Sequence, residues 1–292
     1  MLNGVRPLRF TVKADTSRQI TCHWTLKPAG KLDLLNDRAG LSQLREILIP
    51  AFRAAAGITD LNQNGFRLTI DLPQPDQTEI HLVAGQNAPC LNPQDWRTKK
   101  SSTWDPKAPL PFHAAWAEAA RQRQEALTPG GRRLFYVEGE HDFFGLQDGD
   151  PKSETHFIML SVRPFINLFD EEITPAHWER YFSAAGQILL ALGLADQPAR
   201  LTANSGFAFQ ALPRLHMHVQ TAGRPLPKLF PQDYGFTVNE AGVIEAPAGS
   251  EPHARIIGLI DQRKNIAGND PNTTALRKAL DQQLFAALDS LG

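Results

Sequence analysis

The stretch that decides the fold runs from Asn204 to Gln220 and reads NSGFAFQALPRLHMHVQ. Its second part alternates between polar and apolar residues, which is typical of a β-strand with one face on a core. The polar residues are Arg214, His216, His218 and Gln220. The apolar residues between them are Leu215, Met217 and Val219. The pattern predicts a strand over 213–221 whose polar face can line a cleft.

Two imidazoles and a guanidinium on one strand face suit an anion such as a phosphate ester. One imidazole can attack phosphorus while its neighbour donates a hydrogen bond to the phosphoryl oxygens or to the leaving group. Two solvent-facing histidines on an edge strand are the plainer alternative. A pair of histidines can also bind a metal ion, but no third ligand has a clear spacing to His216 and His218. We therefore expect no metal and no cofactor.

Around this strand, residues 133–223 resemble the histidine triad (HIT) superfamily along nearly their whole length. Three segments carry the resemblance, in the family's order: RLFYVEGEHDFFGLQDGDP at 133–151, THFIMLSVRPFINLFDEEITPAHW at 155–178 and NSGFAFQALPRLHMHV at 204–219. The resemblance implies an α+β fold, a HIT-like antiparallel sheet with helices. It also implies a nucleotide as the ligand.

The resemblance assigns roles to individual residues. His216 matches the middle histidine, the nucleophile that forms a nucleotidyl-imidazole, and His218 matches the last histidine, which contacts the phosphate. Asp148 matches the acid that binds ribose hydroxyls, although a loop-capping role is the alternative. His156 matches the histidine that opens the second strand, where a buried structural role is equally open.

Asn204 and Gln210 complete the expected site. Asn204 matches the asparagine at the phosphate end, and Gln210 lies where it could reach a phosphate oxygen. The chain departs from the family pattern at Arg214, which replaces the first histidine, and at Ala211, which replaces a hydroxyl. A guanidinium cannot accept a hydrogen bond, so Arg214 cannot copy the orienting role of that histidine. It could instead clamp a phosphate.

Two parts of the chain share one order of elements. Residues 19–85 and 155–223 each read strand, Lys/Arg-Pro, helix, Gly, strand, turn, strand, Ala-Gly. Pro28 precedes His81 by 53 positions, and Pro164 precedes His216 by 52. This similarity predicts two HIT-like units in one chain, as in the galactose-1-phosphate uridylyltransferase and dinucleoside tetraphosphate phosphorylase types. The first unit, which keeps only His81 on its triad strand, is expected to be noncatalytic.

The remaining segments predict further elements and the domain limits. Helices are expected over 41–56, 112–127, 174–192 and 272–290, a long loop or linker over 86–111, and a short strand over 254–260. We expect a degenerate HIT-like half with its linker at 1–110, a HIT domain at 111–225 and a C-terminal extension at 226–292. Because one chain would supply both units of a pseudo-dimer, the protein is expected to be a monomer.

Composition limits the class of protein. The chain has 292 residues, of which 42% are hydrophobic and 21% charged, with a net charge of −1. Wholesale disorder and bulk binding to nucleic acid or membrane surfaces are therefore not expected. The two cysteines, Cys22 and Cys90, form no disulfide framework, and no signal peptide or membrane-length apolar run precedes or interrupts the pattern. These features predict a cytoplasmic protein.

The expected function is that of a nucleotidyl hydrolase or transferase. Its substrate would be a phosphate ester, anhydride or phosphoramidate of a nucleoside, and its intermediate a nucleotidyl-histidine. The alternative, which Arg214 and Ala211 favour, is a nucleotide-binding HIT-fold protein without turnover.

Overall fold

A computed structural model gives the arrangement of the chain. The residues that it describes are 10–14, 22–28, 48, 66–72, 79–84, 96, 118, 134–136, 143–149, 151, 153, 155–163, 165–168, 170, 172–205, 210, 212, 214–221, 228, 230–239, 243–268 and 270–291. The helices expected over 41–56 and 112–127, the linker over 86–111 and Ala211 therefore lie outside this part of the chain, apart from single positions such as Leu48 and Trp96.

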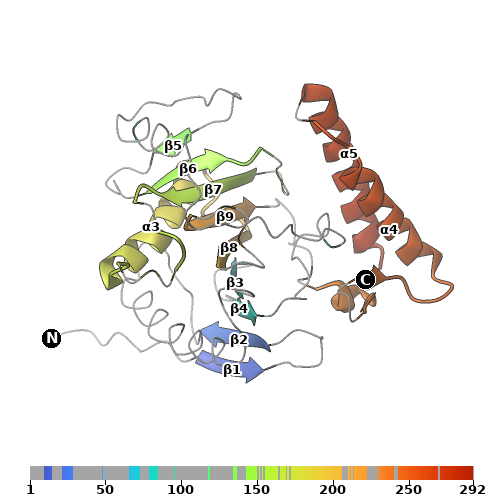
Figure 1. Cartoon of the computed structure of the whole chain (residues 1–292), viewed down its shortest axis with the longest axis horizontal. Coiled ribbons are helices and arrows are strands. Elements are labelled where there is room, and N and C mark those ends of the chain that lie inside the picture. Colours follow the sequence, from blue (N-terminus) through green and yellow to red (C-terminus); the bar gives the residue numbers. More distant parts are fainter. Residues whose placement is uncertain are drawn as a thin grey trace.

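The body of the protein is one nine-stranded sheet with the order β1-β2-β4-β3-β8-β9-β7-β6-β5 (Figure 1). All neighbouring strands whose pairing is described are antiparallel. Together with the long helices of the described residues, this sheet confirms the α+β class. The strand bounds are β1 Phe10–Ala14, β2 Cys22–Pro28, β3 Phe66–Leu72, β4 Glu79–Ala84, β5 Leu134–Tyr136, β6 Phe143–Gln147, β7 Thr155–Ser161, β8 Ala199–Ser205 and β9 His216–Thr221.

The pairing is symmetric about the centre of the sheet, where β3 lies against β8. Thr69 faces Thr202 there. Outward from this point, the order β3-β4-β2-β1 on one side matches the order β8-β9-β7-β6 on the other. The pair Phe10↔Pro28 corresponds to Phe143↔Ser161, 133 residues later in both strands. The ladder is therefore consistent with two units in one chain. Their origin by duplication, the domain limits and the monomeric state remain predictions.

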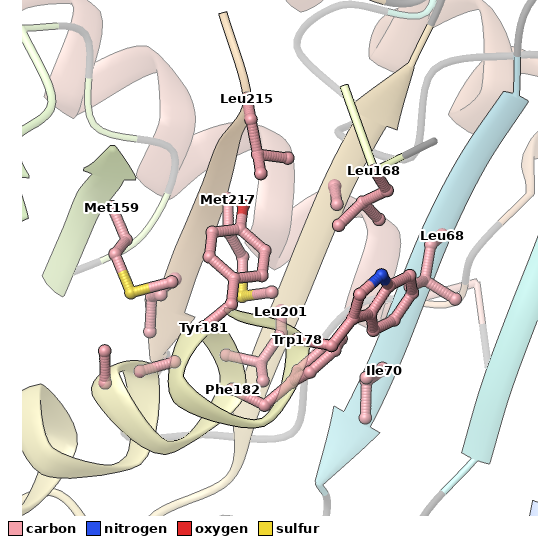
Figure 2. Packing of buried hydrophobic residues seen from close by; sticks show 14 of the residues in the cluster. Leu68, Ile70, Met159, Leu168, Trp178, Tyr181, Phe182, Leu201, Leu215 and Met217 are labelled. Carbon is pink, nitrogen blue, oxygen red and sulfur yellow. The ribbon is translucent and has the colours of Figure 1, made fainter. Parts of the chain in front are cut away.

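One face of the sheet is packed against helix α3, Pro175–Ala191. The helix begins where the sequence predicts, because the Thr174 side chain accepts from the backbone N–H of His177 and Pro175 occupies the first turn. It ends before Gly193, whose φ of 69° requires the left-handed conformation that glycine adopts without strain. Figure 2 shows Trp178, Tyr181 and Phe182 directed at apolar side chains of β3, β8, β9 and β7, among them Leu68, Leu201, Met217 and Met159.

The C-terminal part forms a second apolar cluster. Its elements are η2 (Pro231–Tyr234), β10 (Thr237–Val238), β11 (Ile244–Glu245), α4 (Glu251–Lys264) and α5 (Pro271–Asp289). Figure 1 shows α4 and α5 as an antiparallel pair beside the sheet. The strand expected over 254–260 is wrong, because this segment belongs to α4. Ile256, Leu259, Ile260 and Arg263 are its buried residues, and their spacing is helical.

Arg263 donates to the Asp281 carboxylate, which ties α4 to α5. None of the helices in the described part of the chain combines the length and apolar composition needed to cross a membrane.

Candidate functional site

The face of the sheet opposite α3 carries polar side chains in rows that run across the strands. Side chains of directly opposed residues share a face, so each row can be read from the pairing. One row joins Asp71, Arg200, Gln220 and His156, and the next joins Thr69, Thr202, His218 and Ile158. Continuing the ladder by one residue gives the third row, with Arg67, Asn204, His216 and Leu160. Four of the expected site residues, His156, Asn204, His216 and His218, thus share one face.

The two histidines of the H-x-H pair lie inside the sheet. Strand β9 lies between β8 and β7, so the alternative of solvent-facing histidines on an edge strand is wrong. His216 is only 3% exposed, whereas the His218 side chain is 24% exposed. Their ring centroids are 5.1 Å apart with an interplanar angle of 77°. A ligand can therefore reach the pair from the side of His218.

His216 is held by a backbone carbonyl. Its Nδ1 lies 2.7 Å from the carbonyl oxygen of Arg214. Because a carbonyl oxygen only accepts, the Nδ1–H of His216 must donate in this bond. In the neutral ring the lone pair is then on Nε2, which is the tautomer that a nucleophile needs. The bond fixes both the orientation of the ring and the position of its proton.

The same carbonyl explains how His216 can be oriented although Arg214 replaces the first histidine of the family pattern. The acceptor that orients His216 is a main-chain oxygen, which any residue at position 214 supplies. The inability of a guanidinium to accept a hydrogen bond therefore does not remove this orientation. A phosphate-clamping role for the Arg214 side chain remains a prediction.

Gln210 braces the loop that carries this carbonyl. Its side chain is buried, and Nε2 donates to the carbonyl of Ile166 at 2.6 Å and to that of Arg214 at 3.0 Å. Both amide hydrogens are committed to the backbone. The phosphate contact expected of Gln210 would require one of these bonds to be exchanged.

Asp148, His156 and His218 form a compact group. Nε2 of His156 lies 3.0 Å from Nδ1 of His218. The Asp148 Oδ2 atom lies 3.4 Å from the first of these nitrogens and 3.7 Å from the second. Asp148 follows β6, and its backbone N–H donates to the carbonyl of His156 at 3.0 Å, which places the carboxylate beside the strand. The ribose contact expected of Asp148 remains a prediction, and its Oδ2 is directed at the histidines.

The Asn204 side chain is hydrogen-bonded to a residue from the first half of the chain. Its Oδ1 accepts from Nε of Arg67 at 2.8 Å, and both side chains are buried. With the oxygen engaged, the Asn204 amide nitrogen is the group that can donate to a phosphate. Sequence reasoning missed Arg67. The signal that could have found it is the similarity of FRLTIDL at 66–72 to ARLTANS at 199–205, which aligns Arg67 with Arg200.

The first half carries a different set at the corresponding positions. Thr69 faces His81 as Thr202 faces His218, so the strand pairing aligns His81 with His218. The similar spacing from Pro28 and Pro164 had instead suggested that His81 corresponds to His216. Glu79 then corresponds to His216. Nε2 of His81 lies 3.5 Å from Oε2 of Glu79, and Nδ1 lies 3.5 Å from the Thr25 hydroxyl.

Comparisons with known proteins give structural likenesses at low identity. No family model and no curated protein matches the chain. It is similar to a GalT-like protein from Arabidopsis thaliana, with 10% identity, a TM-score of 0.41, and coverage of 73% of this chain and 69% of that one. An ADP-glucose phosphorylase from A. thaliana with bound ADP-glucose has 11% identity and a TM-score of 0.39, with 68% and 62% covered. A uridylyltransferase mutant has 12% identity and a TM-score of 0.41, with 95% and 90% covered.

Proposed function

We propose that the protein catalyses nucleotidyl transfer through a covalent adduct on His216. The observation that carries the proposal is the bond from His216 Nδ1–H to the Arg214 carbonyl, which fixes the tautomer of the neutral ring with its lone pair on Nε2, the atom that attacks. His218 lies beside it on the same face, where it can donate to the phosphoryl oxygens. Asn204 lies in the adjacent strand with its amide nitrogen available to the same group.

The proposed reaction has two steps. In the first, Nε2 of His216 attacks the phosphorus of a nucleoside phosphate ester, anhydride or phosphoramidate. The N–P bond forms as the bond to the leaving group breaks, and the leaving group departs with the bonding electron pair and takes up a proton. In the second, water, phosphate or a sugar phosphate attacks the phosphorus, gives up its proton and releases neutral His216. Water as the acceptor makes the protein a hydrolase, and the other acceptors make it a transferase.

The charge of the site supports an anionic substrate. Arg67 is buried and directs Nε at a neutral amide, whereas its ladder counterpart Arg200 is matched by the Asp71 carboxylate. The row that contains His216 therefore also includes the guanidinium of Arg67. Positive charge near the phosphoryl group stabilises the transition state of phosphoryl transfer.

The test is adduct formation on the full chain. Incubation with labelled nucleoside polyphosphates, nucleotide sugars and nucleoside phosphoramidates should give an acid-labile nucleotidyl adduct, located on His216 by mass spectrometry. His216→Ala should abolish the adduct and lower turnover by on the order of 10³-fold or more. Nucleotide binding, measured by calorimetry, should survive because Asp148, Asn204 and Arg67 remain.

The matched control is His81→Ala, which removes a buried imidazole from the corresponding strand of the first half. Its adduct should form as in the wild type. An adduct that persists in His216→Ala, or that is lost in His81→Ala, would place the chemistry elsewhere. Nucleotide binding without any adduct would show a binding protein without turnover.

A further inference from the structure

The group formed by Asp148, His156 and His218 has the donor atoms of a metal site. One ligand atom from each side chain, Nε2 of His156, Nδ1 of His218 and Oδ2 of Asp148, lies close to the other two. The three separations are 3.0, 3.4 and 3.7 Å. No local sequence spacing reveals this set, because His218 meets His156 only through the pairing of β9 with β7.

The separations identify the geometry that the group can support. Around a tetrahedral ion with bonds of about 2.1 Å, ligand atoms lie about 3.4 Å apart, whereas on one face of an octahedron they lie about 3.0 Å apart. The observed 3.0, 3.4 and 3.7 Å are centred on the tetrahedral value. An ion at equal distance from all three atoms therefore lies near the point that a tetrahedral centre requires, without movement of the strands.

The donors, taken together with the tetrahedral separations, favour Zn²⁺ over an octahedral ion such as Fe²⁺, which two histidines and a carboxylate also bind. Two imidazole nitrogens and one carboxylate oxygen are a ligand set of Zn²⁺, and catalytic zinc sites keep three protein ligands and an open fourth position. The His156 side chain is 2% exposed, whereas those of Asp148 and His218 are 15% and 24% exposed. The open side therefore lies toward Asp148 and His218, where an ion can enter and a fourth ligand can bind. We propose that Asp148, His156 and His218 bind one Zn²⁺, with water or a phosphate oxygen as the fourth ligand.

The proposal goes beyond nucleotidyl transfer and fits beside it. Coordination through Nδ1 of His218 fixes the remaining proton of that ring on Nε2, where it can donate to a phosphoryl oxygen. The nearby His216 is not among the three residues whose ligand atoms lie together, and its Nε2 is the atom that attacks phosphorus in the proposed transfer. The competing explanation of the short separations is a hydrogen-bonded group that shares a proton and has no affinity for metal.

The experiment uses the full chain, stripped of metal by a chelator and titrated with Zn²⁺ or Co²⁺. The wild type should bind one ion per chain, show the intense visible absorption of four-coordinate Co²⁺, and unfold at a higher temperature with Zn²⁺ present. Asp148→Asn, His156→Ala and His218→Ala should each weaken binding at least about tenfold. His81→Ala, which disrupts the pair that His81 forms with Glu79 in the first half, should leave the affinity within about twofold of wild type.

His218→Ala and Asp148→Asn keep the result interpretable if His156→Ala fails to fold, because both side chains are partly exposed. Absence of the Co²⁺ band and of Zn²⁺ stabilisation in the wild type would overturn the proposal, as would binding that survives both of these variants. His216→Ala separates the two proposals, since it should bind Zn²⁺ normally while forming no adduct. An adduct formed in chelator-treated protein that binds no Zn²⁺ would refute the metal site and leave nucleotidyl transfer standing.

Discussion

Asp71→Asn should destabilise the joint between the two halves of the sheet. Arg200 on β8 donates through Nε to Asp71 Oδ1 at 2.6 Å and through Nη2 to Oδ2 at 3.0 Å. The side chains of Arg200 and Asp71 are 4% and 14% exposed. This bidentate ion pair links β8 to β3, through residues that are 129 positions apart in the chain. Asparagine keeps the shape of the side chain and removes its charge.

The expected magnitude follows from the geometry. At about 3 Å and an effective dielectric constant of about 20, two unit charges attract by about 5 kcal/mol. The cost of keeping both groups from water offsets much of this attraction in the native pair. Removing one partner of such a pair leaves the other charge buried and costs about 3–5 kcal/mol. Since Asp71 retains some contact with water, we expect Asp71→Asn to lower the free energy of unfolding by about 3 kcal/mol.

The assay is urea unfolding of the full chain, with Asp71→Leu, Arg200→Met and the double variant Asp71→Leu/Arg200→Met completing a cycle. The double variant should cost less than Asp71→Asn alone, because no charge remains buried without a partner. Glu79→Gln is the matched control. It makes the same change of charge directly opposite Asp71, but on a side chain that is 37% exposed, and should cost less than about 1 kcal/mol. A loss below about 0.5 kcal/mol for Asp71→Asn, or strict additivity, would refute the reasoning.

Three further substitutions test the site and the core. Arg214→Ala keeps the carbonyl that orients His216, so a slowing of adduct formation by more than about threefold in single-turnover kinetics would assign the Arg214 side chain its predicted phosphate contact, and a smaller effect would exclude that contact. Gln210→Ala removes the brace on the same carbonyl and should slow adduct formation about tenfold. Tyr181→Phe should raise the free energy of unfolding by about 1 kcal/mol, since the buried Tyr181 hydroxyl has no hydrogen-bond partner among the described residues. Burial raises the pKa of Tyr181 well above its ordinary value, so wild-type stability should fall as pH rises above about 10 and the variant should lose less, as followed by urea unfolding between pH 8 and 11.

The alternation around His216 predicted the strand and its two faces, because a period of two is a local property of the chain. Met217 and Val219 do pack against the core, and His216 and His218 do share the other face. The place of that strand within the sheet is not local. It depends on which strands pair. Because β9 lies between β8 and β7, the alternative of two solvent-facing histidines on an edge strand is wrong.

The short strand expected over 254–260 shows the limit of reading a brief apolar run. Ile256, Ile257, Leu259 and Ile260 satisfy both a buried strand and one turn of a buried helix, and periodicity over so few positions does not separate the two. The packing of α4 against α5 decides in favour of the helix, and Arg263 meets Asp281 only there. Arg67 was missed for a related reason, since its contact with Asn204 spans 137 positions and crosses the joint between β3 and β8.

The symmetric ladder finally explains why one half carries the proposed chemistry. The position that holds His216 in the second half holds Glu79 in the first, and the position of His218 holds His81. A carboxylate beside a single imidazole lacks the pair of neighbouring imidazoles that attack on phosphorus and donation to its oxygens would require. Arg67, by contrast, points from the first half to Asn204 in the second. The first half therefore contributes to the proposed site through its cation across the β3–β8 joint, and its own triad strand is suited to support and not to catalysis.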